Sequence, residues 1–253
     1  WEKIGVRVDG EYRQLNANIL QIENEYYSSV RPKQLLQGLE SPAVALKKRG
    51  IRYIELRSLD VNAYHPLGVD EEQLRFLETW MLTCLLADSP RLSDAEQRAH
   101  NQNLVDVAHR GREPGLELNR DGEPVSLREW GQEVLHAMLP VAEYMDRVHG
   151  CNDYEDALDE QLNKILHPEL TPSARMLHEM LTNGESFYHF AHRLSLQHHR
   201  FFSNRELSAA QTREFDQVVE QSFADQARIE AREQGDFDQF LEEYFAQTYA
   251  ALR

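Results

Sequence analysis

Apolar and polar residues alternate near the start of the chain, which is the pattern of β-strands that bury one face. Residues 4–8 alternate in this way and lead into Asp9-Gly10, a dipeptide that favours the tight turn of a hairpin. We therefore expect a β-hairpin whose second strand runs over residues 12–21.

Another strand is expected over residues 51–57, where the same alternation returns. Before it, Pro32 and Pro42 indicate a loop, and residues 41–48 indicate a short helix that ends at the glycine soon after it. Residues 58–70, which include a proline and a glycine, should form a loop.

The hydrophobic period becomes helical from Asp70 onward. Pro140 should kink or break the helix expected over residues 127–149, because proline removes one backbone hydrogen bond. Residues 113–124 read as a loop. Three serines, each followed three positions later by Glu or Gln, should begin helices: Ser93, Ser126 and Ser208. The apolar residues of the first helical stripe are Leu74, Leu77, Met81, Leu82, Leu85 and Leu86.

These patterns predict an α+β fold, with antiparallel strands in residues 1–70 and a largely helical region in residues 71–253. The last helix carries aromatic residues at helical spacing and should pack on the rest of the fold. Its aromatic positions include Phe237, Phe240, Tyr244, Phe245 and Tyr249.

Charge and composition narrow the classes of function. The 43 acidic and 27 basic residues give a net charge of −16, which argues against nucleic acids or anionic membranes as partners. Two cysteines form no metal-binding spacing, and we expect Cys84 to be a core residue in a reducing, cytoplasmic setting. The chain begins at Trp1 with residues that already read as structured protein, so we expect it to be part of a longer chain.

Glu55 and Arg57 are the first candidates for chemistry. Strand geometry puts Tyr53, Glu55 and Arg57 on one face, with neighbouring side chains about 6.5–7 Å apart. A carboxylate there can hold Mg²⁺, and a guanidinium beside it can bind phosphate oxygens. On spacing alone an ordinary surface ion pair is the commoner explanation.

Arg31-Pro32-Lys33 forms a local cationic segment in this acidic chain. It could meet nucleotide phosphate or a substrate carboxylate, or it could pair with nearby Glu23 and Glu25. Composition does not separate these alternatives. Two pairs of histidines in residues 189–199 lack a companion ligand at metal-binding spacing, so we expect polar helix-face residues there.

Two ordered segments, QLNANILQIENEYYSSVRPK at residues 14–33 and GIRYIELRSLDVNAYHPLGVDEEQLRFL at residues 50–77, closely resemble the proteobacterial type of glutamate–cysteine ligase. Similarity continues through LLADSP at residues 85–90, GREPGLEL at residues 111–118 and LTPSARML at residues 170–177. The chain is thereby identified as the C-terminal part of a member of this family.

The resemblance implies a partial antiparallel sheet of the glutamine-synthetase-like ligase fold, with helices around it. It also implies an ATP-dependent ligase that joins the γ-carboxylate of L-glutamate to L-cysteine through a γ-glutamyl phosphate, the first step of glutathione synthesis. Mg²⁺ or Mn²⁺ and arginines must then neutralise the anionic groups as the phosphate transfers.

Individual roles follow from the same resemblance. Glu55 falls on a metal-binding glutamate, Arg57 on an arginine that contacts the transferred phosphate, and Tyr27 on a tyrosine of the cysteine pocket. Arg31 and Lys33 match a family segment and are candidates for nucleotide or phosphate contact.

The family's other metal-binding carboxylates lie in an N-terminal half that is absent here, so we expect this chain alone to be inactive. Two rival hypotheses stay open. The chain could belong to another carboxylate–amine ligase of the superfamily, or it could be a non-catalytic helical interaction module.

Overall fold

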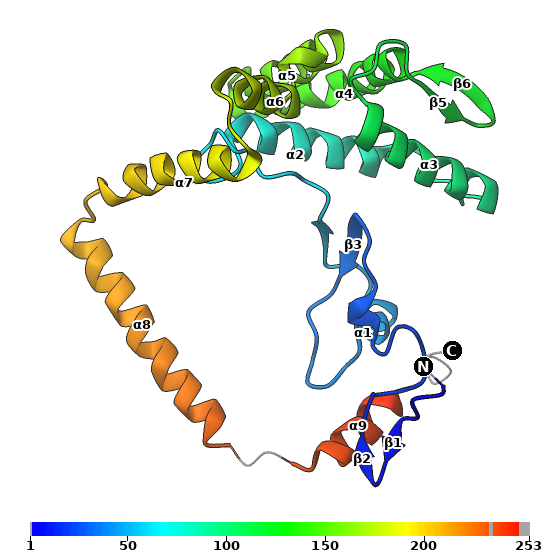
Figure 1. The fold of residues 1–253 in the computed structure, drawn as a ribbon, viewed down its shortest axis with the longest axis vertical. Helices are drawn as coiled ribbons and strands as arrows, with labels where there is room; N and C mark the ends of the chain where they lie inside the picture. The colour runs from blue at the N-terminus through cyan, green and yellow to red at the C-terminus, as the bar shows by residue number, and fades with distance from the viewer. Residues whose placement is uncertain (1, 233–234, 248–253) are drawn as a thin grey trace. The chain divides into compact units, whose positions relative to one another are not determined.

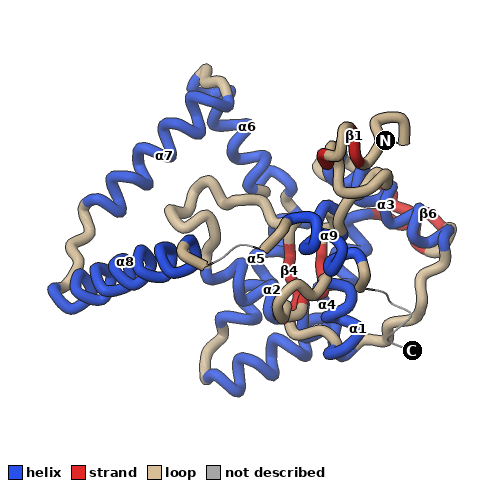
Figure 2. Tube along the Cα trace, turned by 90° about the horizontal axis from the view of Figure 1, so that it is seen from below, coloured by secondary structure: helices blue, strands red, loops and turns tan. Residues whose placement is uncertain are grey.

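A computed structural model describes residues 2–232 and 235–247. The chain divides into two compact units. One, which we call the sheet unit, combines residues 1–60 with residues 207–253, and the other, the helical unit, comprises residues 61–206. Helices predominate in the part of the chain that the structure describes (Figure 2). The strands described there form three antiparallel pairs. The predicted α+β class is therefore confirmed.

The sheet unit begins with a hairpin of β1 (Arg7–Val8) and β2 (Glu11–Tyr12). Its turn has positive φ angles of 53° at Asp9 and 85° at Gly10, as the Asp-Gly pair predicts. The second strand ends at Tyr12, so the strand expected to continue to residue 21 is wrong.

The segment after β2 is held by its own polar side chains. Asn16 Oδ1 accepts the Asn18 N–H at 2.8 Å, and Gln21 Oε1 accepts the Leu15 N–H at 2.8 Å. Amide side chains that bond to nearby backbone groups compete with a strand ladder in this way. A short 3₁₀ helix, η1 (Glu23–Glu25), follows.

Strands β3 (Val30–Lys33) and β4 (Tyr53–Leu56) form the second antiparallel pair (Figure 1). Helix α1 (Pro42–Arg49) lies between them in sequence and ends at Gly50, as expected. Pro32 lies inside β3 rather than in the expected loop. A two-stranded sheet has only edge strands, which tolerate a residue without an N–H.

Two helices complete the sheet unit, α8 (Ala209–Glu230) and α9 (Phe237–Phe245). Helix α9 packs on the first hairpin: Arg7 pairs with Asp238 at 2.8 Å, and the rings of Tyr12 and Phe237 lie 6.0 Å apart edge to face. Leu241 is buried. The predicted packing of the last helix is thus confirmed for its described part, while Tyr249 lies outside the described residues.

The helical unit contains six α-helices, one 3₁₀ helix and one hairpin among its residues, all of which are described (Figure 1). Its elements are α2 (Glu71–Leu86), α3 (Asp94–Arg110), β5 (Glu117–Arg120), β6 (Glu123–Ser126), α4 (Leu127–His149), α5 (Asp153–Leu166), η2 (Pro168–Leu170), α6 (Pro172–Asn183) and α7 (Phe187–Ser203). The change to helices near residue 70 falls at α2. A functional division of the chain at that point stays a prediction.

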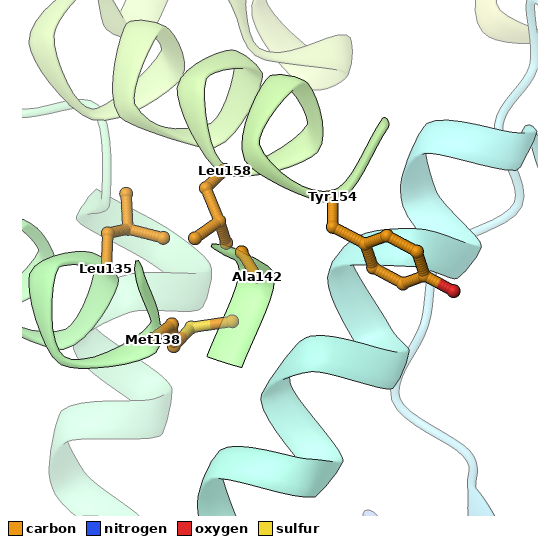
Figure 3. Packing of buried hydrophobic residues seen from close by; sticks show 5 residues of the cluster. All are labelled: Leu135, Met138, Ala142, Tyr154 and Leu158. Carbon is orange, nitrogen blue, oxygen red and sulfur yellow. The ribbon is translucent and has the colours of Figure 1, made fainter. Parts of the chain in front are cut away.

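The core of the helical unit joins α4 and α5. Its buried members come from these two helices, and the side chain of Tyr154 points toward α2 (Figure 3). They are Leu135, Met138, Ala142, Tyr154 and Leu158. Helix α2 closes this core, because the Tyr154 hydroxyl donates to Glu78 at 2.8 Å and accepts from Arg75 at 3.1 Å.

Pro140 does not break α4, which continues to His149. Met138 and Ala142, on either side of the proline, are fully buried in the core. This packing offsets the lost backbone hydrogen bond and keeps both parts in one helix.

Two further expectations for this region are wrong. Residues 113–124 contain most of the β5–β6 hairpin, whose turn has φ angles of 56° at Asp121 and 92° at Gly122. Cys84 is exposed rather than in the core. Helix α2 is apolar on several sides, so periodicity alone did not identify its buried face, where Thr79 lies.

Candidate active-site face on strands β3 and β4

The register of β3 and β4 places the predicted site residues on one face of the sheet. Arg31 lies opposite Glu55, and Lys33 lies opposite Tyr53. The Arg57 N–H continues the ladder by donating to the Ser29 carbonyl at 2.8 Å. Because directly opposite residues in an antiparallel pair share a face, the two cations of β3 join the polar face of β4. We call this surface the β3–β4 face.

Glu55 accepts hydrogen bonds from two cations. Its Oε2 atom lies 3.1 Å from Lys33 Nζ and 2.9 Å from Arg57 Nη2. These hydrogen bonds, first that of Lys33 and then that of Arg57, hold the pKa of the Glu55 carboxyl below its ordinary value. Glu55 is therefore ionised at neutral pH, and both cations are fixed beside it.

Tyr27 lies next to Arg57. Its hydroxyl donates to the Arg57 carbonyl oxygen at 3.3 Å, and its ring centre is 6.0 Å from the Arg57 guanidinium carbon. The side chain is otherwise open, since 65% of the residue surface is exposed. The structure thus brings together all five residues singled out from the sequence: Tyr27, Arg31, Lys33, Glu55 and Arg57.

A cavity of about 440 Å³ adjoins this face within the sheet unit. Arg31, Lys33 and Tyr53 line it together with residues of η1 and α1, whereas Glu55 and Arg57 do not. Arg31 forms no ion pair or side-chain hydrogen bond with any residue that the structure describes. It is therefore the cation of this face that is most available to an anionic ligand.

Glu23 is a cavity residue whose structural role the sequence did not indicate. Its Oε2 atom accepts the N–H of Ala43 at 2.8 Å, and its Oε1 atom lies 3.4 Å from Ser41 Oγ. The carboxylate thereby caps the first turn of α1, where Ser41 itself makes no side-chain cap. No local spacing signals this contact, because 20 residues separate Glu23 from Ala43.

The described residues do not by themselves fit a magnesium ion. No group of three His, Cys, Asp or Glu side chains among them is placed to hold a metal. Glu55 is the predicted ligand, but Lys33 and Arg57 occupy one of its oxygens and would repel a divalent cation. Mg²⁺ requires near-octahedral oxygen ligation, which one carboxylate cannot supply.

Comparison with known proteins relates the chain to one enzyme family. A family model described as glutamate–cysteine ligase matches residues 1–107. The glutamate–cysteine ligase of Pseudomonas fluorescens (strain Pf0-1) is 44% identical over 248 residues, which are 98% of this chain and 47% of that protein. That of Alcanivorax borkumensis is 41% identical over 250 residues, covering 97% of this chain and 48% of the relative.

A solved structure shows the same relationship. The glutamate–cysteine ligase of Francisella tularensis, crystallised in complex with AMP, matches 97% of this chain and 48% of its own, with a TM-score of 0.85 and 32% identity. The fold and the relatives show that the chain is a homologue of the glutamate–cysteine ligases, and the resemblance seen in the sequence is confirmed.

The chain spans about half the length of the curated relatives that it matches. None of the described helices combines the length and the apolar character needed to cross a lipid bilayer.

Proposed function

We propose that this chain supplies one wall of the active site of a cytoplasmic glutamate–cysteine ligase. The reaction joins the γ-carboxylate of L-glutamate to the amine of L-cysteine, with ATP forming a γ-glutamyl phosphate on the way, and it begins glutathione synthesis. The observation that carries the proposal is the meeting of five predicted residues on the β3–β4 face of a homologue of these ligases.

The cations of this face would bind phosphate. Arg57 presents a planar guanidinium that can contact two oxygens of the transferred phosphoryl group, while Lys33 acts as a point charge. Arg31 lines the neighbouring cavity without a described ion-pair partner, and we assign it to the nucleotide phosphates. The AMP bound by the Francisella tularensis structure supports a nucleotide site in a homologue.

Tyr27 would help to bind cysteine. Its one O–H now donates to the Arg57 carbonyl, and it would turn from that carbonyl to donate to a substrate carboxylate. Holding the amine of cysteine near the acyl phosphate is a task of position rather than of acid–base chemistry. The Tyr27 ring lies 6.0 Å from the Arg57 guanidinium carbon, so the predicted cysteine position is next to the predicted phosphate position.

Glu55 would contribute one oxygen to a Mg²⁺ or Mn²⁺ ion only when further carboxylates are supplied from outside this chain. We propose that these come from the remaining length of the ligase, which the resemblance places on the N-terminal side. In the described residues Glu55 instead fixes Lys33 and Arg57, so its charge organises the two phosphate-binding candidates.

A chimera tests this function directly. This chain would replace the segment that it matches in the Pseudomonas fluorescens ligase, and γ-glutamylcysteine and ADP would be measured. We expect activity that requires L-glutamate, L-cysteine and ATP together. A folded chimera that fails to form γ-glutamylcysteine, or that accepts another amine better than cysteine, would overturn the proposal.

A further inference from the structure

The helical unit contains a second and larger cavity, distinct from the β3–β4 face. It has a volume of about 800 Å³ and lies between α2, α4, α5, the segment 111–116 and the start of α6. All its lining residues fall within positions 76–172, so the whole cavity belongs to one compact unit. The volume is in the range of about 300–1,000 Å³ that is usual for small-molecule sites.

The cavity wall is largely apolar and partly aromatic. Phe76, Trp130 and Ile165 line it, and Leu135 of the α4–α5 core forms part of its wall. Gly131 adds a stretch of bare helix, where a Cβ atom would lie only 2.8 Å from Ile165 Cδ1. Core side chains thus support this wall, and its rings suit an aromatic ligand body.

The cavity is lined by three cations, Arg112, Arg128 and Lys164, and by one acidic residue, Glu113, which already has a partner. Arg110 binds the Glu113 carboxylate through two contacts of 2.8 and 2.9 Å. Arg112 and Arg128 form no ion pair with a described residue. Lys164 lies 3.4 Å from Glu160, and its side chain is 24% exposed. An apolar cavity with a positive border is thus present in a chain whose net charge is −16.

We propose that this cavity binds a small aromatic carboxylate, with the ring system among the apolar residues and the carboxylate at Arg112 and Arg128. Charge complementarity selects an anion over a neutral or cationic ligand of the same shape. The segment 111–118, which stands out in the sequence and has no role on the β3–β4 face, is then one wall of a binding site.

Calorimetric titration of the 253-residue chain with 2-naphthoate tests the proposal, with 2-naphthamide as the uncharged comparison. We expect saturable one-to-one binding of naphthoate and weaker binding of the amide. The double substitution Arg112→Gln and Arg128→Gln should weaken naphthoate about fivefold and leave the amide unchanged, because exposed charges contribute modestly. Arg98→Gln, an exposed change on α3 away from the cavity, is the matched control.

Gln161→Trp provides a separate test of location, because it places an indole into the cavity from α5. It should reduce the binding of both ligands. Equal binding of naphthoate and naphthamide, naphthoate binding unchanged by the arginine substitutions, or no saturable binding would each overturn the inference. Binding by this chain but not by the chimera with the Pseudomonas fluorescens ligase would also overturn it, because the cavity would then be covered by polypeptide.

Discussion

Glu55 shows how two cations fix the state of one carboxyl group. Hydrogen bonds from Lys33, and secondly from Arg57, lower its pKa in the folded protein. A lowered folded-state pKa stabilises the fold where the carboxylate is ionised. The contribution of Glu55 to the free energy of unfolding is therefore complete at pH values above the ordinary Glu pKa of about 4.3. It is lost as the pH falls through the lower pKa of the folded protein.

Replacement of Lys33 should be visible at Glu55. In Lys33→Gln we expect the Glu55 pKa to rise toward its ordinary value, because the larger of the two stabilising hydrogen bonds is lost. Carboxyl ¹³C chemical shifts followed against pH would measure it. Lys47→Gln, an exposed change on α1, should leave the titration where it was, and an unmoved titration in Lys33→Gln would contradict the description of the site.

The sequence could predict part of this face and not the rest. Alternation along one strand was enough to place Glu55 and Arg57 on the same side. The pairing of Lys33 with Glu55 depends on the register between two strands separated by α1, and that register is set by tertiary structure. Local spacing therefore left the partner of Lys33 open.

Helix α5 is an element whose start depends on another helix. Asp146 of α4 accepts the N–H groups of Tyr154 and Glu155, both at 3.0 Å, while Asn152 provides no side-chain cap. Burial raises the pKa of Asp146, but these backbone donors outweigh it, and the pKa lies below its ordinary value. The charged carboxylate thus stabilises the first turn of α5.

Asp146→Asn should destabilise the helical unit by about 1–3 kcal/mol, because an amide cannot accept at both positions and leaves a buried N–H unpaired. Urea unfolding followed by circular dichroism would show a lower midpoint with an unchanged slope. The deficit should shrink as the pH falls below about 3.9, where Asp146 loses its advantage as it is protonated. Asp159→Asn, an exposed change on α5, is the control. A midpoint of Asp146→Asn as high as that of the control would refute this role of Asp146.

Local sequence patterns predicted the start of a helix correctly where neighbouring residues in the sequence determine that start. Ser93, Ser126 and Ser208 each begin a helix as expected, since an N-cap acts within one turn. The β5–β6 hairpin was missed because its prolines and glycines also describe a loop. The caps that Glu23 and Asp146 supply come from outside the helices that they cap, so they leave no N-cap pattern at the start of those helices.

At the scale of the whole molecule, the main fact is that the chain spans about half the length of its relatives. The β3–β4 face presents phosphate-binding candidates and one carboxylate, and no group of three His, Cys, Asp or Glu side chains among the described residues could hold Mg²⁺. The similarity to the glutamate–cysteine ligases was predictable from two ordered sequence segments. The second cavity was not, because segments 111–116, 126–135 and 161–172 meet only in the folded unit.

The isolated chain should therefore not form γ-glutamylcysteine. Incubation with L-glutamate, L-cysteine, ATP and Mg²⁺, followed by chromatographic detection of the dipeptide, would measure this. The chimera serves as the positive control. Dipeptide formation by the chain alone would contradict this prediction, because it would show that residues of this chain suffice to hold the metal ion and catalyse the reaction.

The most direct test of the β3–β4 face is turnover of the chimera carrying Glu55→Gln or Arg57→Lys. Each should lower kcat about 100-fold or more, as removal of one group that stabilises developing charge commonly does. Glu11→Gln and Arg52→Lys, exposed residues outside the face, should retain the turnover of the parent chimera. If both site variants kept a kcat within about twofold of the parent chimera, the account would be contradicted. A loss of only about 1.4 kcal/mol in transition-state stabilisation would already lower kcat tenfold.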